Sequence, residues 1–146
     1  MWERFEIKRT TAGVTEMDGL AATWGSLTYD FLLPVNQRLR FKKGDYVAAT
    51  LIGDDAAAMP DSTLVRLVVT DNAGKVKHVL FNGLYARMQD FRDVEARCYL
   101  QIDREIYVEA GEHVVMLVNG LDAAATGDVD ASAGTIKISC DRWHNY

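Results

Sequence analysis

Apolar and polar residues alternate with a period of two along almost the whole sequence, in runs rich in Val, Ile, Leu, Tyr and Phe. Alternation of this kind predicts β-strands that bury one face, and helical spacing is scarce. We therefore predict an all-β fold, with strands at residues 5–9, 28–33, 38–41, 46–52, 63–70, 75–81, 96–102, 106–108, 113–119 and 135–140.

The segment 82–95, "NGLYARMQDFRDVE", is the one candidate for a helix, because Leu84, Met88 and Phe91 have helical spacing. A second interpretation remains open for the same residues. They also suit a crossing loop that lays Tyr85 and Phe91 over an open sheet edge.

No Pro-rich or Gly/Ser-rich linker divides the 146 residues, so we expect one domain over 1–146. Its strands are joined by tight connections, such as "TDNAG" at 70–74, and by long ones at 53–62 and 120–134. This mixture favours an antiparallel β-sandwich of jelly-roll type. Terminal arms at 1–12 and 141–146 are also compatible with the sequence.

One short pattern occurs twice, as "FKKGDYV" at 41–47 and as "VEAGEHV" at 108–114. Each copy has the end of a short strand, a two-residue lead, a glycine, an acidic residue and the start of a long alternating strand. Gly44 and Gly111 would supply a positive φ that β-branched residues adopt only at a cost. We predict that both are structural turns and that they pass the chain between facing β-layers.

The extended copies, "FKKGDYVAATL" and "VEAGEHVVMLV", enclose the predicted hairpin "LVRLVVTDNAGKV". This arrangement over residues 28–140 resembles the strand corners of small jelly-roll domains. Such domains include the pre-peptidase C-terminal type and several viral coat and decoration proteins. The resemblance implies a jelly-roll fold, and the trimers of similar proteins imply a homotrimer.

The net charge of −5 and the pI near 5.1 disfavour nucleic acid or an anionic membrane as partner, since both require a cationic surface. Charged residues in "MWERFEIKRT" interrupt the apolar core that a signal peptide needs, so we expect synthesis in the cytoplasm. Cys98 and Cys140 are predicted to be buried thiols, with a disulfide across the sandwich as the alternative.

We predict no catalytic residue, no metal site and no cofactor. "GDVDASAG" resembles the start of a calcium loop through Asp128 and Asp130, but Gly134 comes one place late and Ser139 stands where a glutamate should close the site. No hydrolase elbow, zincin helix or Cys-x-x-Cys pair occurs. Asp103 and Glu105 form an acidic pair that a solvated strand end explains.

Large aromatic side chains stand at both chain ends, as Trp2 and Phe5 and, in "CDRWHNY", as Trp143 and Tyr146. Leaving them in water would be costly, so something is expected to cover them. Two interpretations are open. Either both ends add strands to the domain's own sheets, or the four residues anchor an interface with a neighbouring subunit.

These observations favour a non-enzymatic structural protein, namely a decoration or minor capsid protein of a virus or phage. Its partners would be other copies of itself, as a trimer, and a major shell protein, and its location would be the virion. The alternative is a carbohydrate-binding or adhesion module on the same sandwich, with Trp24 or Tyr85 as the residue on which a sugar stacks.

Overall fold

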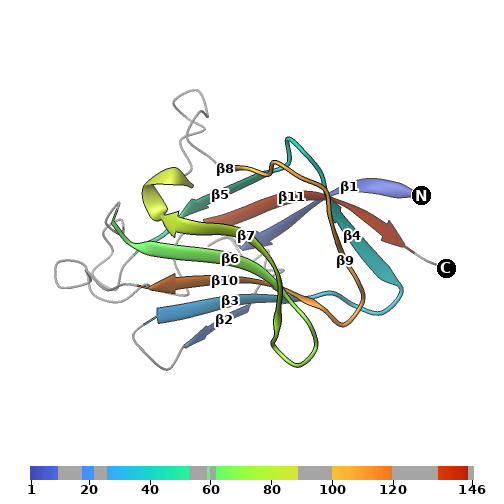
Figure 1. The fold of residues 1–146 in the computed structure, drawn as a ribbon, viewed down its shortest axis with the longest axis horizontal. Coiled ribbons are helices and arrows are strands. Elements are labelled where there is room, and N and C mark those ends of the chain that lie inside the picture. Colours follow the sequence, from blue (N-terminus) through green and yellow to red (C-terminus); the bar gives the residue numbers. More distant parts are fainter. Residues whose placement is uncertain are drawn as a thin grey trace.

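Two antiparallel β-sheets face one another and enclose the hydrophobic core (Figure 1). The computed structural model describes residues 1–9, 18–21, 26–52, 59, 62–88, 100–119 and 135–144. Its elements are β1 (Trp2–Arg9), β2 (Asp18–Ala21), β3 (Ser26–Leu32), β4 (Gln37–Phe41), β5 (Tyr46–Thr50), β6 (Leu64–Thr70), β7 (Val76–Leu84), the 3-10 turn η1 (Tyr85–Arg87), β8 (Leu100–Gln101), β9 (Ile106–Val108), β10 (His113–Asn119) and β11 (Thr135–His144).

The predicted antiparallel β-sandwich is confirmed. β9 and β10 have the predicted bounds, and β6 differs by one residue. β2 was missed because its four residues are too few to show alternation. β1 begins and β11 ends beyond the predicted strands, at Trp2 and His144.

β11 is the central strand of the first sheet, called sheet A below. One edge of β11 pairs with β1 along its length, and the other edge pairs first with β5 and then with β4. β4 and β5 therefore lie end to end beside β11, and β9 and β8 lie in the same way beside them. Residues 2–9 and 135–144 thus form paired strands instead of free arms, and the two chain ends lie close together (Figure 1). Residues 10–12, 145 and 146 of the predicted arms lie outside the described residues.

The second sheet, sheet B, has the order β2-β3-β10-β6-β7. A tight turn closes the β6–β7 hairpin, as predicted from "TDNAG". The Asp71 carboxylate accepts hydrogen bonds from the backbone N–H groups of Ala73 and Lys75, both at 2.9 Å, and Gly74 has a φ of +85°. The side chain of Asp71 therefore replaces backbone partners that the turn leaves unpaired.

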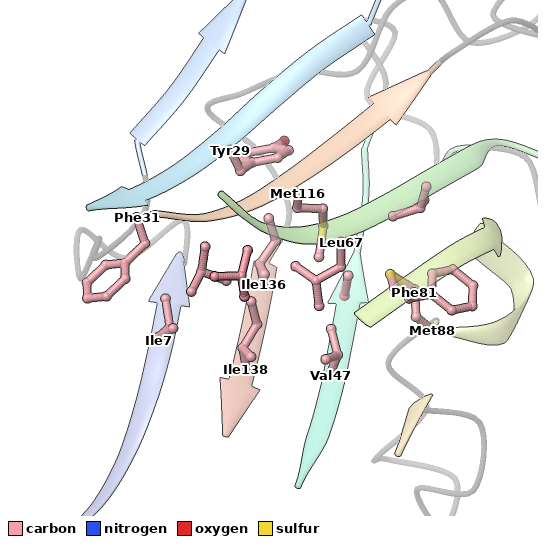
Figure 2. Packing of buried hydrophobic residues seen from close by; sticks show 14 of the residues in the cluster. Ile7, Tyr29, Phe31, Val47, Leu67, Phe81, Met88, Met116, Ile136 and Ile138 are labelled. Atoms are coloured by element: carbon pink, nitrogen blue, oxygen red, sulfur yellow. The ribbon is translucent and has the colours of Figure 1, made fainter. Parts of the chain in front are cut away.

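The core lies between the sheets, where inward-facing side chains of both layers interdigitate (Figure 2). Period-two alternation places Ile136, Ile138 and Cys140 of β11 inward, opposite Met116 of β10 and its neighbours. The largest fully buried side chains come from strands of both sheets and from residues that directly follow β3, β5 and η1, and they are Tyr29, Phe41, Ile7, Leu33, Leu39, Leu51, Leu67, Met88, Met116, Ile136 and Ile138. A core of this extent needs no disulfide to hold the sheets together.

The two copies of the repeated pattern form the same turn. The N–H of Asp45 donates to the carbonyl of Lys42, and the N–H of Glu112 donates to the carbonyl of Glu109, both at 3.0 Å. In each turn the acidic side chain also accepts from the N–H three residues earlier, at 2.9 Å for Asp45 and 2.8 Å for Glu112. Gly44 and Gly111 have φ values of +94° and +85°. The acidic residue after each glycine is thus part of the turn.

The expectation that both turns cross between layers is corrected at Gly44. Gly111 lies between β9 of sheet A and β10 of sheet B, so that turn does change sheets. Gly44 joins β4 to β5, which follow one another along the same edge of β11. The two turns have the same local geometry. Their shared sequence pattern does not determine which sheet the next strand joins.

Replacing Gly44 or Gly111 with alanine is expected to lower the free energy of unfolding by about 1–2 kcal/mol at each site, because an L-residue resists positive φ. No atom lies within 4 Å of the added Cβ at either site, so backbone conformation is the only cost. Asparagine should cost less, since it tolerates this conformation. Urea denaturation measures the effect. Lys43→Ala in the same turn is the control, and equal losses for Lys43→Ala and Gly44→Ala would contradict the explanation.

The helix predicted over 82–95 is wrong for its first residues. Residues 82–84 belong to β7, and Tyr85–Arg87 form one 3-10 turn. Tyr85 is buried, and its hydroxyl accepts a hydrogen bond from the N–H of Leu51 at 2.8 Å, while the N–H of Ala49 donates to the carbonyl of Met88 at 2.8 Å. Residues 85–88 therefore cross from β7 to the edge of sheet A. Residues 89–95 lie outside the described residues.

Candidate functional site

The outer face of sheet A carries a row of paired aromatic and charged side chains near the chain ends. Because Phe5 and Ile7 face the core, alternation directs Trp2 and Arg4 outward from β1. The antiparallel register sets Trp2 opposite Trp143 and Arg4 opposite Asp141. β4 continues both rows, with Arg38 opposite Trp143 and Arg40 opposite Asp141.

Asp141 is a buried anion surrounded by three cations. Its carboxylate accepts hydrogen bonds from Arg4 Nη1 at 2.6 Å and Arg40 Nη2 at 2.8 Å, and Lys42 Nζ lies 3.2 Å away. Burial raises the pKa of Asp141, but the hydrogen bonds from Arg40, Arg4 and Lys42 outweigh burial and hold the pKa below its ordinary value. The carboxylate is therefore ionised at neutral pH and joins β1, β11 and β4.

Arg4 extends this network to Asp45, the acidic residue of the Gly44 turn. Its Nη2 lies 2.5 Å from Asp45 Oδ1, and the hydroxyl of Ser139 donates to the same oxygen at 3.3 Å. Asp45 is buried, so an unpaired carboxylate there would be costly. The network thus fixes the turn, the edge strand β1 and the central strand β11 relative to one another.

Aromatic rings and guanidinium groups pack against each other in the neighbouring row. The guanidinium of Arg40 lies 4.3 Å from the ring centroid of Trp2, and that of Arg38 lies 4.3 Å from the ring of Tyr107. Trp2 also contacts the Trp143 ring edge to face, with centroids 5.6 Å apart and planes at 67°. These contacts hold the rings without burying them, and Trp143 remains 36% exposed.

Beside the two tryptophans lies a surface depression of about 500 Å³. Arg38 Nε donates to Glu109 Oε1 at 2.8 Å across it. Asn36, in the turn between β3 and β4, has a φ of +63°, which is uncommon for a residue other than glycine. The lining residues come from β1, the start of β4, the Gly111 turn and β11, and they are Trp2, Asn36, Gln37, Arg38, Glu109, Ala110 and Trp143.

The other predicted site residues have different positions. Phe5 packs against the core, with Phe31 at 6.3 Å between centroids and the Arg142 guanidinium at 4.1 Å from its ring. Tyr85 is 2% exposed, so its ring is a core residue and offers no stacking face for a sugar. Trp24 and Tyr146 lie outside the described residues. The role of Trp2 and Trp143 as interface anchors stays a prediction.

Sequence reasoning missed a group of exposed aliphatic side chains on the β6–β7 hairpin. This aliphatic patch consists of Leu64, Val76, Val79 and Leu84, which are 43%, 37%, 37% and 45% exposed. Leu64 lies opposite Leu84, and Val79 lies opposite Val68. For Leu64 the signal was the run "LVRLVV" at 64–69, in which apolar residues occupy both faces of the strand.

The cysteines, the acidic pair and the metal ligands considered in the sequence lie away from this depression. Cys140 is a buried free thiol, and burial raises its pKa, while Cys98 lies outside the described residues. Asp103 and Glu105 are both exposed.

Over the part of the chain with described coordinates, no three His, Cys, Asp or Glu side chains are grouped to hold a metal ion. Within the same part, no helix has the length and hydrophobicity of a membrane span. Asp128 and Asp130 lie in the undescribed segment 120–134.

Comparison by sequence finds no match, either among protein-family models or among curated proteins. Comparison by structure finds proteins with a similar fold. VP17, a capsid protein of bacteriophage P23-77, matches with a TM-score of 0.57 and 10% identity over 100% of this chain and 98% of VP17. The complex of VP16 and VP17, the two major capsid proteins of the same phage, matches with a TM-score of 0.62 and 12% identity, covering 99% of each chain.

A CocE/NonD family hydrolase from Staphylococcus aureus matches with a TM-score of 0.43 and 9% identity, over 98% of this chain and 36% of the hydrolase. The two phage matches cover at least 98% of both chains. The sandwich is of jelly-roll type, as predicted. The resemblance to jelly-roll domains of viral capsids, predicted from the repeated turns, is likewise confirmed.

Proposed function

We propose that this chain is a non-enzymatic structural protein of a viral or phage capsid, of decoration or minor type. The observation that carries the proposal is the fold match to capsid proteins of phage P23-77, which leaves almost no part of either chain without a counterpart. A rigid sandwich of this kind serves by holding contact surfaces in fixed positions. In this role the protein would be made in the host cytoplasm and would end up in the virion.

The proposed partners are other copies of this chain, as a closed trimer, and a major shell protein. The matched complex of two capsid proteins supports partnership with a second protein of the shell. A trimer satisfies the general preference of homo-oligomers for closed symmetry. The net charge of −5 supports protein partners over nucleic acid.

We assign the aliphatic patch as a contact surface for a neighbouring shell protein. Large exposed aliphatic groups on one hairpin are costly in water and become favourable when a partner covers them. β7 is the last strand of sheet B, and among the described strands only β6 pairs with it. Its free backbone edge and the aliphatic side chains at both ends of the hairpin, with Arg66 and Asn82 between them, are therefore open to a neighbour.

The double variant Leu64→Glu/Leu84→Glu is expected to weaken association with other shell proteins at least about 10-fold, since each carboxylate would be buried without a partner. The chain should still fold, because both side chains are about half exposed, although two carboxylates directly opposite one another will lower its stability. Co-sedimentation with particles measures the change. Val35→Glu is the control, since Val35 is 78% exposed and lies outside the patch. Equal association of both variants would contradict the assignment.

The function itself is tested by measuring the copy number of this chain in purified particles of the source virus, by quantitative mass spectrometry. We expect a fixed number per particle that matches a multiple of the icosahedral or vertex symmetry. A copy number below that of the major shell protein supports a decoration or minor role, and an equal number supports a main shell role. Absence of the chain from intact particles would contradict the proposal.

A further inference from the structure

The depression beside Trp2 and Trp143 combines an exposed aromatic surface with several planar polar groups. Trp143 is held by β11 and by its contact with Trp2, so its partly exposed indole is presented in one orientation. Trp2 is fixed in turn by the Arg40 guanidinium at 4.3 Å. An indole held in this way offers a flat apolar surface without further loss of side-chain entropy on binding.

The polar residues that line the depression, here called the polar wall, supply hydrogen-bond donors and acceptors. Asn36 and Gln37 carry amides, which both donate and accept, while Arg38 donates and Glu109 accepts. The Arg38–Glu109 ion pair joins Nε to one carboxylate oxygen, and the Arg38 guanidinium also packs on the ring of Tyr107, so its position is fixed from two sides. Paired donors and acceptors of this kind match neighbouring hydroxyl groups on a ring.

The polar wall is also preorganised. The N–H of Gly111 donates to the carbonyl of Leu33, and the N–H of Leu33 donates to the carbonyl of Glu112, both at 3.0 Å. These bonds tie the β3–β4 turn to the Gly111 turn and fix the two sides of the wall. Asn36 holds a φ of +63° that glycine would adopt more easily, and it places an amide at the wall that glycine would lack.

The charge balance of the depression narrows the class of ligand. Arg38 and Glu109 neutralise each other, and the nearby Arg40 already pairs with Asp141. The one cation and one anion of the lining cancel, so the depression offers no net electrostatic attraction to a phosphate or another charged ligand. A neutral ligand with an apolar face and several hydroxyl groups leaves both pairs intact. Sugars in the pyranose form have this chemistry, because their ring C–H groups form the apolar face. A depression of about 500 Å³ is large enough for one or two such rings.

From this arrangement we propose that the depression is a binding site for a neutral pyranose sugar, stacked on Trp143 and hydrogen-bonded by Asn36, Gln37 and the Arg38–Glu109 pair. The site is independent of the capsid role, because it is complete in a single chain. It differs from the sugar platforms considered at Trp24 and Tyr85, which come from other parts of the sequence.

The test is a titration of the purified full chain with glucose, galactose, mannose and N-acetylglucosamine. It is followed by tryptophan fluorescence and by saturation-transfer NMR. At least one sugar should give saturable binding below about 100 mM, since a ligand of this size is expected to bind in the millimolar range. Inorganic phosphate is the charged control and should give no saturable signal.

Three variants connect the binding to this depression. Trp143→Ala should abolish binding, and Trp143→Phe should restore part of it, because phenylalanine keeps a ring. Asn36→Gly should weaken binding about 10-fold through the lost amide, while glycine keeps the positive φ without strain. Asn36→Gly also keeps the proposal testable if Trp143→Ala does not fold, which circular dichroism will show.

The proposal is overturned if the folded wild-type chain binds none of the four sugars. It is also overturned if a sugar binds and both Trp143→Ala and Asn36→Gly leave the affinity unchanged. A third result would assign the depression to protein contacts and would equally overturn the proposal. In that result the chain ignores every sugar, and Trp143→Ala weakens sedimentation with particles. None of these outcomes depends on the copy number in the virion, so a failure here is separable from a failure of the capsid role.

Discussion

Asp141→Asn is expected to lower the free energy of unfolding by about 3 kcal/mol, near the lower end of the range for breaking a buried ion pair. The asparagine keeps the shape of the side chain but leaves Arg4, Arg40 and Lys42 without their shared anion. Partial exposure of these three cations limits the loss, because water can reach them. Urea denaturation followed by tryptophan fluorescence measures the change.

The loss of stability caused by Asp141→Asn should depend on pH. The pKa of Asp141 in the folded protein lies below its ordinary value, so its stabilisation is fully present above the unfolded pKa of about 3.9 and is lost as the pH falls below it. The difference in the free energy of unfolding between wild type and Asp141→Asn should therefore be constant at neutral pH and shrink below about pH 4.

Glu109→Gln is the control. It breaks the exposed pair with Arg38 and should lower the free energy of unfolding by less than about 1 kcal/mol. If it costs as much as Asp141→Asn, the buried anion is not the centre of the network.

Phe41→Ala is expected to lower the free energy of unfolding by about 4 kcal/mol, because the lost ring leaves a cavity between the sheets. Phe41 is fully buried at the end of β4, opposite Ile106 of β9, and it directly precedes the Gly44 turn. Val35→Ala, at a residue that is 78% exposed, should change stability by less than about 0.5 kcal/mol. Similar values for the two variants would show that the core does not lie where the sheets face one another.

The strands could be predicted because their information is local. Each long strand that buries one face shows period two in its own residues, as in β10, where Val114, Met116 and Val118 are buried. Strand partners are not local. Nothing in the sequence of β4 and β5 indicates that they lie end to end along β11, because that arrangement depends on which edge of β11 each strand reaches.

The positions of the turns could also be predicted from local sequence, but their hydrogen-bond partners and the path of the chain after them could not. A glycine before an acidic residue marks Gly44 and Gly111, but only the structure shows that Asp45 and Glu112 close their turns by accepting backbone hydrogen bonds. The helix expected at 82–95 illustrates the limit. Of the three residues with helical spacing, Leu84 ends β7 and Met88 is buried just after one 3-10 turn, while Phe91 lies outside the described residues.

Half of the candidate site carried a signal that could have been used. Trp2 and Arg4 are two residues apart, and so are Asp141 and Trp143, which predicts one outward face on each of two end strands. Pairing these strands antiparallel would have joined tryptophan to tryptophan and arginine to aspartate. Arg38 and Glu109 carried no such signal, because a strand and a distant turn bring them together.

The aliphatic patch shows why an apolar run is ambiguous. Leu67 and Val69 of β6 are buried in the core, while Leu64 of the same strand is 43% exposed. When both faces of a strand are apolar, the sequence does not alternate. It then cannot show which apolar residues lie on the outer face and which on the inner face. Whether such a residue is exposed or buried then depends on whether a second layer covers that face.

The proposed capsid role is tested most directly by a cryo-electron microscopy map of particles purified from the virus or cell that encodes this chain. It predicts density for this sandwich at symmetry-related positions of the shell, with the aliphatic patch on β6 and β7 covered by a neighbouring protein. A map in which every shell position is filled by other proteins, with no density that fits this chain, would contradict the proposed structural role.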